Sequence, residues 1–456
     1  MKNIVKVWSG SVAFLLSAFS FLILITSCSN ELDEALQPAG NGKLQFVVSD
    51  FPTFGEGTQT RVIGTQDEGK TAWENGDQII VTLTSQKYGE QAAALTYDGS
   101  SWSTEASLSY LEYETPTVSA VYAPCYEVTE EGVKQLRSGM QLGMCEYLEA
   151  ACEIQNGTIN ISFADALRTY SRLRIAGLEN QTLTVTTTDF TPAGATSVAT
   201  EPYTLTTDEK GNAYLYGTFA EGATVNVKKG DVTLTDYTFT FTTELIQSYA
   251  LDARPAIDGT LGGKATAEES DITALVEQLK EYVDNGITTI IVTGAEPAII
   301  DMDSWINTAI GEAIYRLSGS DYYDENNPYN GKIDLILQDV TEIVDQEFYA
   351  AYALNSINLP KVTKIGNEAF CKTWFLRTIT FGTVVKEVNE TGEVMFYQVG
   401  EKVDGCDLIL NCGQMKENSV PTPDLTTNTW KFKFENEFKS ITLTHTGACD
   451  ECKANQ

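Results

Sequence analysis

The sequence predicts a mainly β protein, in which two antiparallel β-sandwich domains are followed by a short leucine-rich-repeat domain, an α+β solenoid. Three observations predict this architecture. Short β-branched and aromatic runs alternate with turn residues as far as about residue 262, which is typical of antiparallel sandwiches. Helical spacing of apolar residues appears only after that point, and apolar positions then recur every 22 residues. A chain of 456 residues is also long enough for two or three domains.

The N-terminal segment is typical of a secretory signal. Lys2 and Lys6 precede an apolar run at 12–25, and small residues then lead to Cys28. The alternative is a membrane-spanning helix, which needs about 20 apolar residues. This run is shorter and two serines interrupt it, so we expect an exported chain and not a membrane-spanning one.

Ile25-Thr26-Ser27-Cys28 resembles a bacterial lipoprotein box. The resemblance implies a signal peptide at 1–27, lipidation of Cys28, and an acylated tether at 28–42. Each buried methylene of such an anchor contributes about 0.8 kcal/mol, so two or three acyl chains hold a protein firmly in a membrane. The acidic leader at 31–34 resembles the signal that exports Bacteroidota lipoproteins to the cell surface, and a plain solvated linker is the alternative. We therefore expect a lipid-anchored protein exposed on the outer membrane.

The charge balance excludes nucleic acid as the main partner. The chain has 30 basic and 63 acidic residues and a formal charge of −33. Removal of Lys2 and Lys6 with the signal makes the charge −35, since −33 − 2 = −35. Such a surface repels phosphate backbones and anionic lipid headgroups, so attachment to a membrane must depend on the anchor.

Residues 43–262 carry the strand pattern of the two sandwiches. A first strand begins at 44–48, and we expect the domain boundary between about residues 150 and 158. The N-terminal sandwich then spans 43–155 and the second spans 156–262. Further strand-like runs occupy 78–84, 117–122, 182–188, 213–219, 223–227 and 232–243.

Thr60-Arg61, followed by the stretch 71–81, resembles the fimbrillin-like lipoproteins, the pilus subunits and relatives of Bacteroidota. In that family a Thr-Arg pair precedes a Thr-x-Trp-x-x-Gly-Asp-x-Ile stretch. The residues themselves predict a tight turn at Gly76, which can adopt positive φ, and a core position for Trp73. A second match at 163–175 has Asp165 where the family often has histidine. The resemblance covers about residues 43 to 262.

Arg61 is the candidate processing site in this region. In pilus-forming members of the family, an arginine-specific protease cuts after such a residue and removes the first strand. The exposed groove then accepts an extended segment of the next subunit by β-augmentation. The alternative is an ordinary surface arginine, which is common in loops.

Residues 265–456 form the third predicted domain. Apolar spacing over 272–283 predicts a helix with Ser270 as its N-cap and Gly286 as its C-terminal stop. A second helix is expected at about 303–317. Five apolar positions recur at an offset of 22, so that Ile343, Phe348, Leu354, Ile357 and Leu359 are followed by Ile365, Phe370, Leu376, Ile379 and Phe381.

The runs 365–370 and 376–379 resemble the BspA-like leucine-rich repeats of bacterial and protist surface adhesins. Only two complete units match, over about 343–388. Three units are normally needed for stability, so we expect the flanking helices and irregular strands to cap the stack. The alternative is a coincidence within an ordinary α+β domain.

One cysteine cluster and one acidic stretch have residue types that can bind metal ions. Cys449 and Cys452 with His445 supply three soft ligands, but structural zinc needs four, so a terminal disulfide or free thiols is preferred. The acidic stretch 321–327 lacks the spaced ligands and glycine of a calcium loop. We expect no metal and no cofactor. Cys28 is assigned to lipidation, and the separation of Cys406 and Cys412 along one strand excludes a disulfide between those two. Otherwise the disulfide state stays open for Cys125, Cys145, Cys152, Cys371, Cys406, Cys412, Cys449 and Cys452.

These observations favour a non-enzymatic surface protein. His445 is the only histidine, so a catalytic triad would depend on it, and no carboxylate pair stands out. We expect the repeats to bind a host or bacterial surface protein or glycan in cell adhesion. The alternatives are a polymerising pilus subunit, which would bind other subunits by donor-strand exchange, and a glycan-binding lipoprotein or hydrolase that displays Trp305 or Trp374. The ligand and the oligomeric state stay open.

Overall fold

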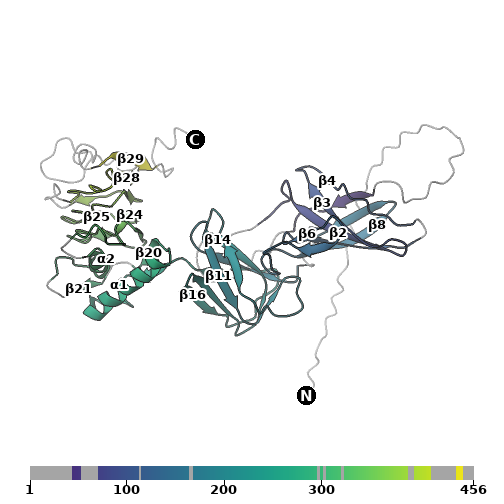
Figure 1. The fold of residues 1–456 in the computed structure, drawn as a ribbon, viewed down its shortest axis with the longest axis horizontal. Coiled ribbons are helices and arrows are strands. Elements are labelled where there is room, and N and C mark those ends of the chain that lie inside the picture. The colour runs from purple at the N-terminus through teal and green to yellow at the C-terminus, as the bar shows by residue number, and fades with distance from the viewer. Residues whose placement is uncertain are drawn as a thin grey trace, which may run out of the picture.

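The computed structural model describes residues 44–52, 70–111, 114–163, 168–294, 298–300, 304–319, 323–388, 395–411 and 438–444. The chain forms two β domains and a third domain that stacks helices and parallel strands (Figure 1). The prediction of a mainly β protein is therefore confirmed. The signal segment, Cys28, the tether, Arg61 and Asp165 lie outside the described residues.

The first domain is built on one seven-stranded sheet that folds over at β8. Residues 148–150 of β8 pair with β5, and residues 151–155 pair with β9, so β8 joins the two halves. The core between the halves holds Ile79 and Val81 from one side and Ile159 and Ile161 from the other. The sheet order is β1-β9-β8-β5-β2-β3-β4, and the strands are β1 Gln45–Val48, β2 Gln78–Ser85, β3 Gly89–Tyr97, β4 Trp102–Ser103, β5 Thr117–Tyr122, β8 Leu148–Gln155 and β9 Thr158–Ser162.

β1 departs from the antiparallel pattern, because it runs parallel to β9 at the edge of the sheet. β9 itself pairs with β8 over its whole length. The first sheet therefore continues to Ser162, beyond the boundary that was expected between about residues 150 and 158. A small hairpin of β6 Tyr126–Val128 and β7 Lys134–Leu136 lies beside the sheet.

Trp73 lies at the centre of an aromatic cluster in the first domain. Its ring centroid lies 4.8 Å from that of Phe51 and 5.2 Å from that of Tyr122. The indole Nε1 donates a hydrogen bond to the carbonyl of Ser49 at 2.8 Å, so the polar atom of this large side chain is satisfied. Gly76 adopts φ +94° in the turn that leads into β2. The predicted core position and the predicted turn are both present.

The second domain is a sandwich of two four-stranded sheets, ordered β12-β14-β10-β17 and β13-β11-β15-β16. Alternating residues of β11, β13, β14 and β15 are buried between the sheets, as the period of two predicts. Phe219 stacks on Phe190 and on Phe239 in this core. The strands are β10 Ser171–Ala176, β11 Thr182–Thr187, β12 Phe190–Pro192, β13 Tyr203–Thr206, β14 Asn212–Phe219, β15 Thr224–Lys229, β16 Val232–Thr238 and β17 Ser248–Asp252.

The third domain begins with two helices. α1 spans Glu269–Asp284, and its N-cap is Glu268, which forms a capping box with Asp271. The predicted N-cap, Ser270, instead lies in the first turn, because the helix begins two residues earlier than predicted. Gly286 follows the helix at φ +72°, which suits a C-terminal stop. α2 spans Ala309–Leu317 and is capped by Thr308, so it is shorter than the predicted helix at about 303–317.

A seven-stranded parallel sheet then runs through the third domain in the order β18-β20-β22-β24-β26-β28-β29, with a three-stranded parallel sheet β23-β25-β27 beside it. Two short strands, β19 and β21, pair near the helices. The strands are β18 Ala256–Asp258, β19 Thr266–Ala267, β20 Thr289–Thr293, β21 Ile299–Ile300, β22 Ile333–Leu337, β23 Glu342–Ile343, β24 Leu354–Leu359, β25 Lys364–Ile365, β26 Thr378–Phe381, β27 Glu387–Val388, β28 Asp407–Asn411 and β29 Ser440–Thr444.

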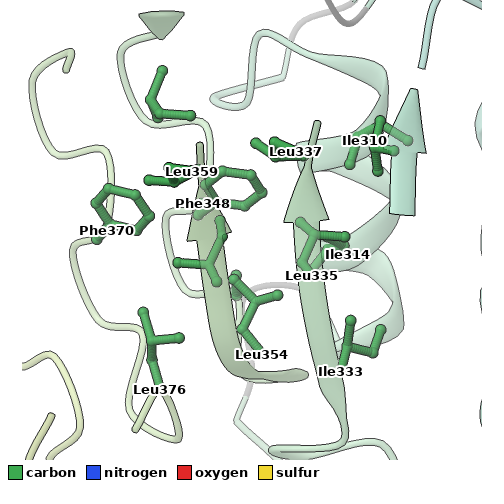
Figure 2. Close-up of a cluster of buried hydrophobic side chains, with 14 of the residues drawn as sticks. Ile310, Ile314, Ile333, Leu335, Leu337, Phe348, Leu354, Leu359, Phe370 and Leu376 are labelled. Carbon is green, nitrogen blue, oxygen red and sulfur yellow. The ribbon is translucent and has the colours of Figure 1, made fainter. Parts of the chain in front are cut away.

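The offset of 22 in the sequence is the register of the central ladders. Ile357 pairs with Ile379, and Ile343 pairs with Ile365. Each step therefore places equivalent apolar residues above one another, and the rings of Phe348 and Phe370 stack at 5.7 Å. Figure 2 shows both rings beside Leu359, with Ile310 and Ile314 of α2 on the opposite side of the core from Phe370. Beyond β26 the register step grows to 29 residues, since Thr378 pairs with Asp407.

The second and third domains share a packed junction. Val232 on β16 belongs to the core of the third domain, and Leu234 packs against the cores of both domains. The side chain of Asn285, at the end of α1, accepts a hydrogen bond from the backbone N–H of Asp231 at 3.1 Å. Apolar packing and this hydrogen bond therefore connect the second domain to the third.

Candidate binding surfaces

The outer face of the long parallel sheet carries one row of polar side chains and a second row that mixes polar residues with isoleucines. Inward residues of each strand are buried, whereas the alternate residues are half-buried or exposed. The ladder register aligns the outward residues across the sheet. One row contains Thr289, Asp334, Ser356, Thr378, Asp407 and Ser440. The next row contains Asn358, Thr380 and Thr442 together with Ile336, Ile409 and the buried Ile291.

Hydrogen bonds between neighbouring strands fix the carboxylates of this face. Asp334 accepts hydrogen bonds from Ser356 at 2.6 Å and from Asn355 at 2.7 Å. Asp407 accepts a hydrogen bond from Ser440 at 2.7 Å. The carboxylates and hydroxyl groups of the polar row are therefore held in place before any partner arrives. Such a face can hydrogen-bond an extended polar ligand at low cost in ordering.

The two tryptophans considered as glycan platforms lie in different environments. Trp305 is 68% exposed, and its ring lies 6.3 Å from that of Tyr349. Trp374 is half-buried and stacks on Tyr352 at 4.8 Å, with Lys402 above the ring at 5.5 Å. Trp305 is thus displayed, whereas Trp374 packs between repeat units.

The structure resolves one of the cysteine pairings that the sequence left open. Cys125 and Cys145 form a disulfide, with their Cα atoms 5.9 Å apart. Cys152, Cys371 and Cys406 are free thiols. Burial raises the pKa of Cys152 and of Cys371 to about 11, so both stay protonated and poorly reactive.

Within the described ranges, no group of three histidine, cysteine or acidic side chains lies close enough together to hold a metal ion. The candidate zinc ligands His445, Cys449 and Cys452 fall outside those ranges, as does Cys412. No helix within the described part of the chain is long and apolar enough to cross a membrane.

The most unusual carboxyl group of the third domain is that of Glu347. Its side chain is fully buried beside α2, and burial raises its pKa to about 8. One oxygen accepts a hydrogen bond from the backbone N–H of Val344 at 2.9 Å. Because the side chain is fully buried, its ionisation changes the stability of the fold.

No family model matches the sequence, and a search of curated proteins found no match. Among solved structures, a candidate cell adhesion protein of Bacteroides fragilis aligns over 46% of this chain and 92% of its own, with 10% identity and a TM-score of 0.22. The shaft pilin SpaA of Lactobacillus rhamnosus aligns over 47% of this chain and 98% of its own, with 14% identity and a TM-score of 0.16. These alignments define neither a family nor a function for this chain.

Proposed function

We propose that this protein is a surface-anchored adhesin. Two β domains hold a C-terminal repeat domain of the leucine-rich type away from the membrane, and its outer sheet face binds a protein or glycan on another cell. The observation that carries this proposal is the polar row of the outer sheet face defined above. Its side chains are aligned by a parallel ladder and their carboxylates are already hydrogen-bonded.

Two further features support an exported, membrane-anchored chain. A disulfide such as Cys125–Cys145 forms and persists in oxidising compartments outside the cytoplasm. The signal-like segment and the resemblance of residues 25–28 to a lipoprotein box support lipidation of Cys28 and attachment to the outer membrane. Recovery of an acylated peptide that begins at Cys28 from surface-shaved cells is the expected result.

A deletion tests the adhesive role of the repeats. Cells that express the chain without residues 265–456 should display the remaining protein at normal density but lose adherence. Because Val232 and Leu234 pack on the deleted domain, a second version should carry serine at both positions to keep the new surface polar. Full adherence by either version at equal surface density would overturn the proposal.

A polymerising pilus subunit is the second candidate, and β1 favours it. This strand is at the edge of the first sheet and is paired over four residues only. Phe46 and Val48 pack into the core, whereas Gln45 and Val47 are exposed, so the strand has the alternation of a segment that another strand could replace. Cleavage after Arg61 and a ladder of polymers on denaturing gels would support this candidate. An intact chain that begins at Cys28 would oppose it.

A further inference from the structure

A cavity of about 510 Å³ lies where the first two domains meet. Its walls come from β5 and the loop 138–146 of the first domain, and from β13 and the start of β14 in the second. Ligand sites prefer such domain interfaces and usually measure roughly 300–1,000 Å³. We propose that this cavity binds a neutral saccharide of one or two sugar units, independently of the outer sheet face.

The second domain supplies an aromatic platform. Asn212, Tyr214 and Tyr216 alternate with buried residues along β14, so the three side chains share the face turned away from the sandwich core. All three line the cavity. The Tyr214 and Tyr216 ring centroids are 6.2 Å apart, and the guanidinium of Arg172 lies 5.4 Å from the Tyr214 ring. The C–H face of a pyranose ring packs on such aromatic faces, while its hydroxyls reach polar neighbours.

The first domain supplies a buried acceptor. Glu146 is 6% exposed and lines the cavity. Arg168 and Tyr170 both donate to its Oε2, at 3.0 and 3.1 Å. A carboxylate has two acceptor oxygens, so Oε1 is left for a ligand hydroxyl. Because Arg168 already neutralises this carboxylate, the acceptor does not demand a cationic ligand.

Charge and backbone geometry point to the same ligand class. Lys70, the basic residue in the lining, is paired with Asp77 at 2.8 Å, so it is not a free site for an anion. β13 is the edge strand of its sheet, and the alternation of an antiparallel ladder directs the backbone groups of Thr204 and Thr206 to the open edge. Those groups can bond ligand hydroxyls.

An added peptide strand fits less well than a saccharide. β13 is only four residues long, whereas strands typically contain about 5–6 residues. The loop 138–146 also lies beside this edge and limits the space along it, because Tyr203 donates to the carbonyl of Leu142 at 3.0 Å and the disulfide holds Cys145 in the wall. The cavity therefore suits a compact ligand.

Glycan arrays and calorimetry test the proposal on the chain from residue 29 onward. The probes are oligosaccharides of one to six units from neutral glucan, mannan, xylan and lactosamine series, with uronic acid oligomers and unstructured peptides as comparison. We expect at least one neutral saccharide to bind. Tyr214→Ala should weaken its binding at least 10-fold and Thr204→Arg should abolish it, because the new side chain fills the cavity.

Two control variants keep the outcome clear. Tyr214→Phe preserves the aromatic face and should bind within threefold of the unaltered chain. Thr238→Arg places the same exposed substitution on β16 of the same sheet, outside the cavity, and should change nothing. The proposal is overturned if no neutral saccharide binds, if only uronates or peptides bind, or if binding survives Thr204→Arg. Thr380→Arg on the outer sheet face should leave this binding intact, which separates the two sites.

Discussion

The guanidinium of Arg168 lies 3.0 Å from the carboxylate of Glu146, and both side chains are buried where the first domain meets the second. Loss of one partner would leave the other charge buried without compensation. We therefore expect Arg168→Met to lower the free energy of unfolding by about 3–5 kcal/mol in urea titrations. The double variant Arg168→Met with Glu146→Leu should recover much of this loss, because no charge stays buried. Equal stability of the single and double variants would contradict this account.

The disulfide between Cys125 and Cys145 closes a short loop. Replacement of both cysteines by alanine should lower stability by about 3 kcal/mol, the value for loops of about 15 residues. A reducing agent should lower the melting temperature of the unaltered chain but not that of the double variant. Cys152→Ala, at a half-buried free thiol, serves as the control and should keep the response to reductant.

The stacked phenylalanines hold the repeat units together. Phe370 is fully buried and its ring lies 5.7 Å from the rings of both Phe348 and Phe396. Phe370→Ala should cost about 3–5 kcal/mol of stability, because a cavity forms in the middle of the stack. The exposed neighbour Arg377→Ala should change stability by less than about 0.5 kcal/mol. Comparable losses for the two variants in thermal melts would show that the stack is not the source of stability.

The buried Glu347 predicts how the stability of the third domain depends on pH. In the folded chain its pKa is about 8, whereas the unfolded chain releases this proton near the usual 4.5. Between these two pH values the unfolded state binds fewer protons than the folded state, so the free energy of unfolding falls as pH rises. Above about pH 8 the stability that the protonated Glu347 contributes is lost. Glu347→Gln should flatten the decline in melting temperature between pH 5 and 8. An unchanged slope would mean that the group titrates normally.

The sequence predicted most of the regular structure where a local period encodes it. The offset of 22 between Phe348 and Phe370 became the ladder register, because stacked units repeat both the strand and its buried ring. Trp73 and Gly76 could likewise be placed from their immediate neighbours. In each case the residues that determine the structure lie within one repeat or one turn of the chain.

Relationships between distant segments could not be read in this way. The Cys125–Cys145 bridge depends on how the loop 138–146 returns to β5, which no spacing encodes. The pairing of β9 with β1 joins segments over 100 residues apart. From the sequence alone, the strand that contains Ile159 fits equally well as the last strand of the first domain or the first strand of the second. The saccharide cavity was missed for the same reason, since Glu146 and Tyr214 meet only after two domains dock. The one local signal for the cavity in the sequence was the alternation of Asn212, Tyr214 and Tyr216 with apolar residues along one strand.

Adherence of cells that carry a single substitution on the outer sheet face tests the central claim most directly. Thr380 lies in the middle of that face, and Thr380→Arg places a long side chain across the rows without disturbing the buried residues. Thr341→Arg makes the same change at an exposed position before β23 and serves as the matched control. At equal surface density, we predict at least a 10-fold loss of adherent cells for Thr380→Arg and none for Thr341→Arg. Full adherence by the Thr380→Arg cells would contradict the assignment of binding to this face.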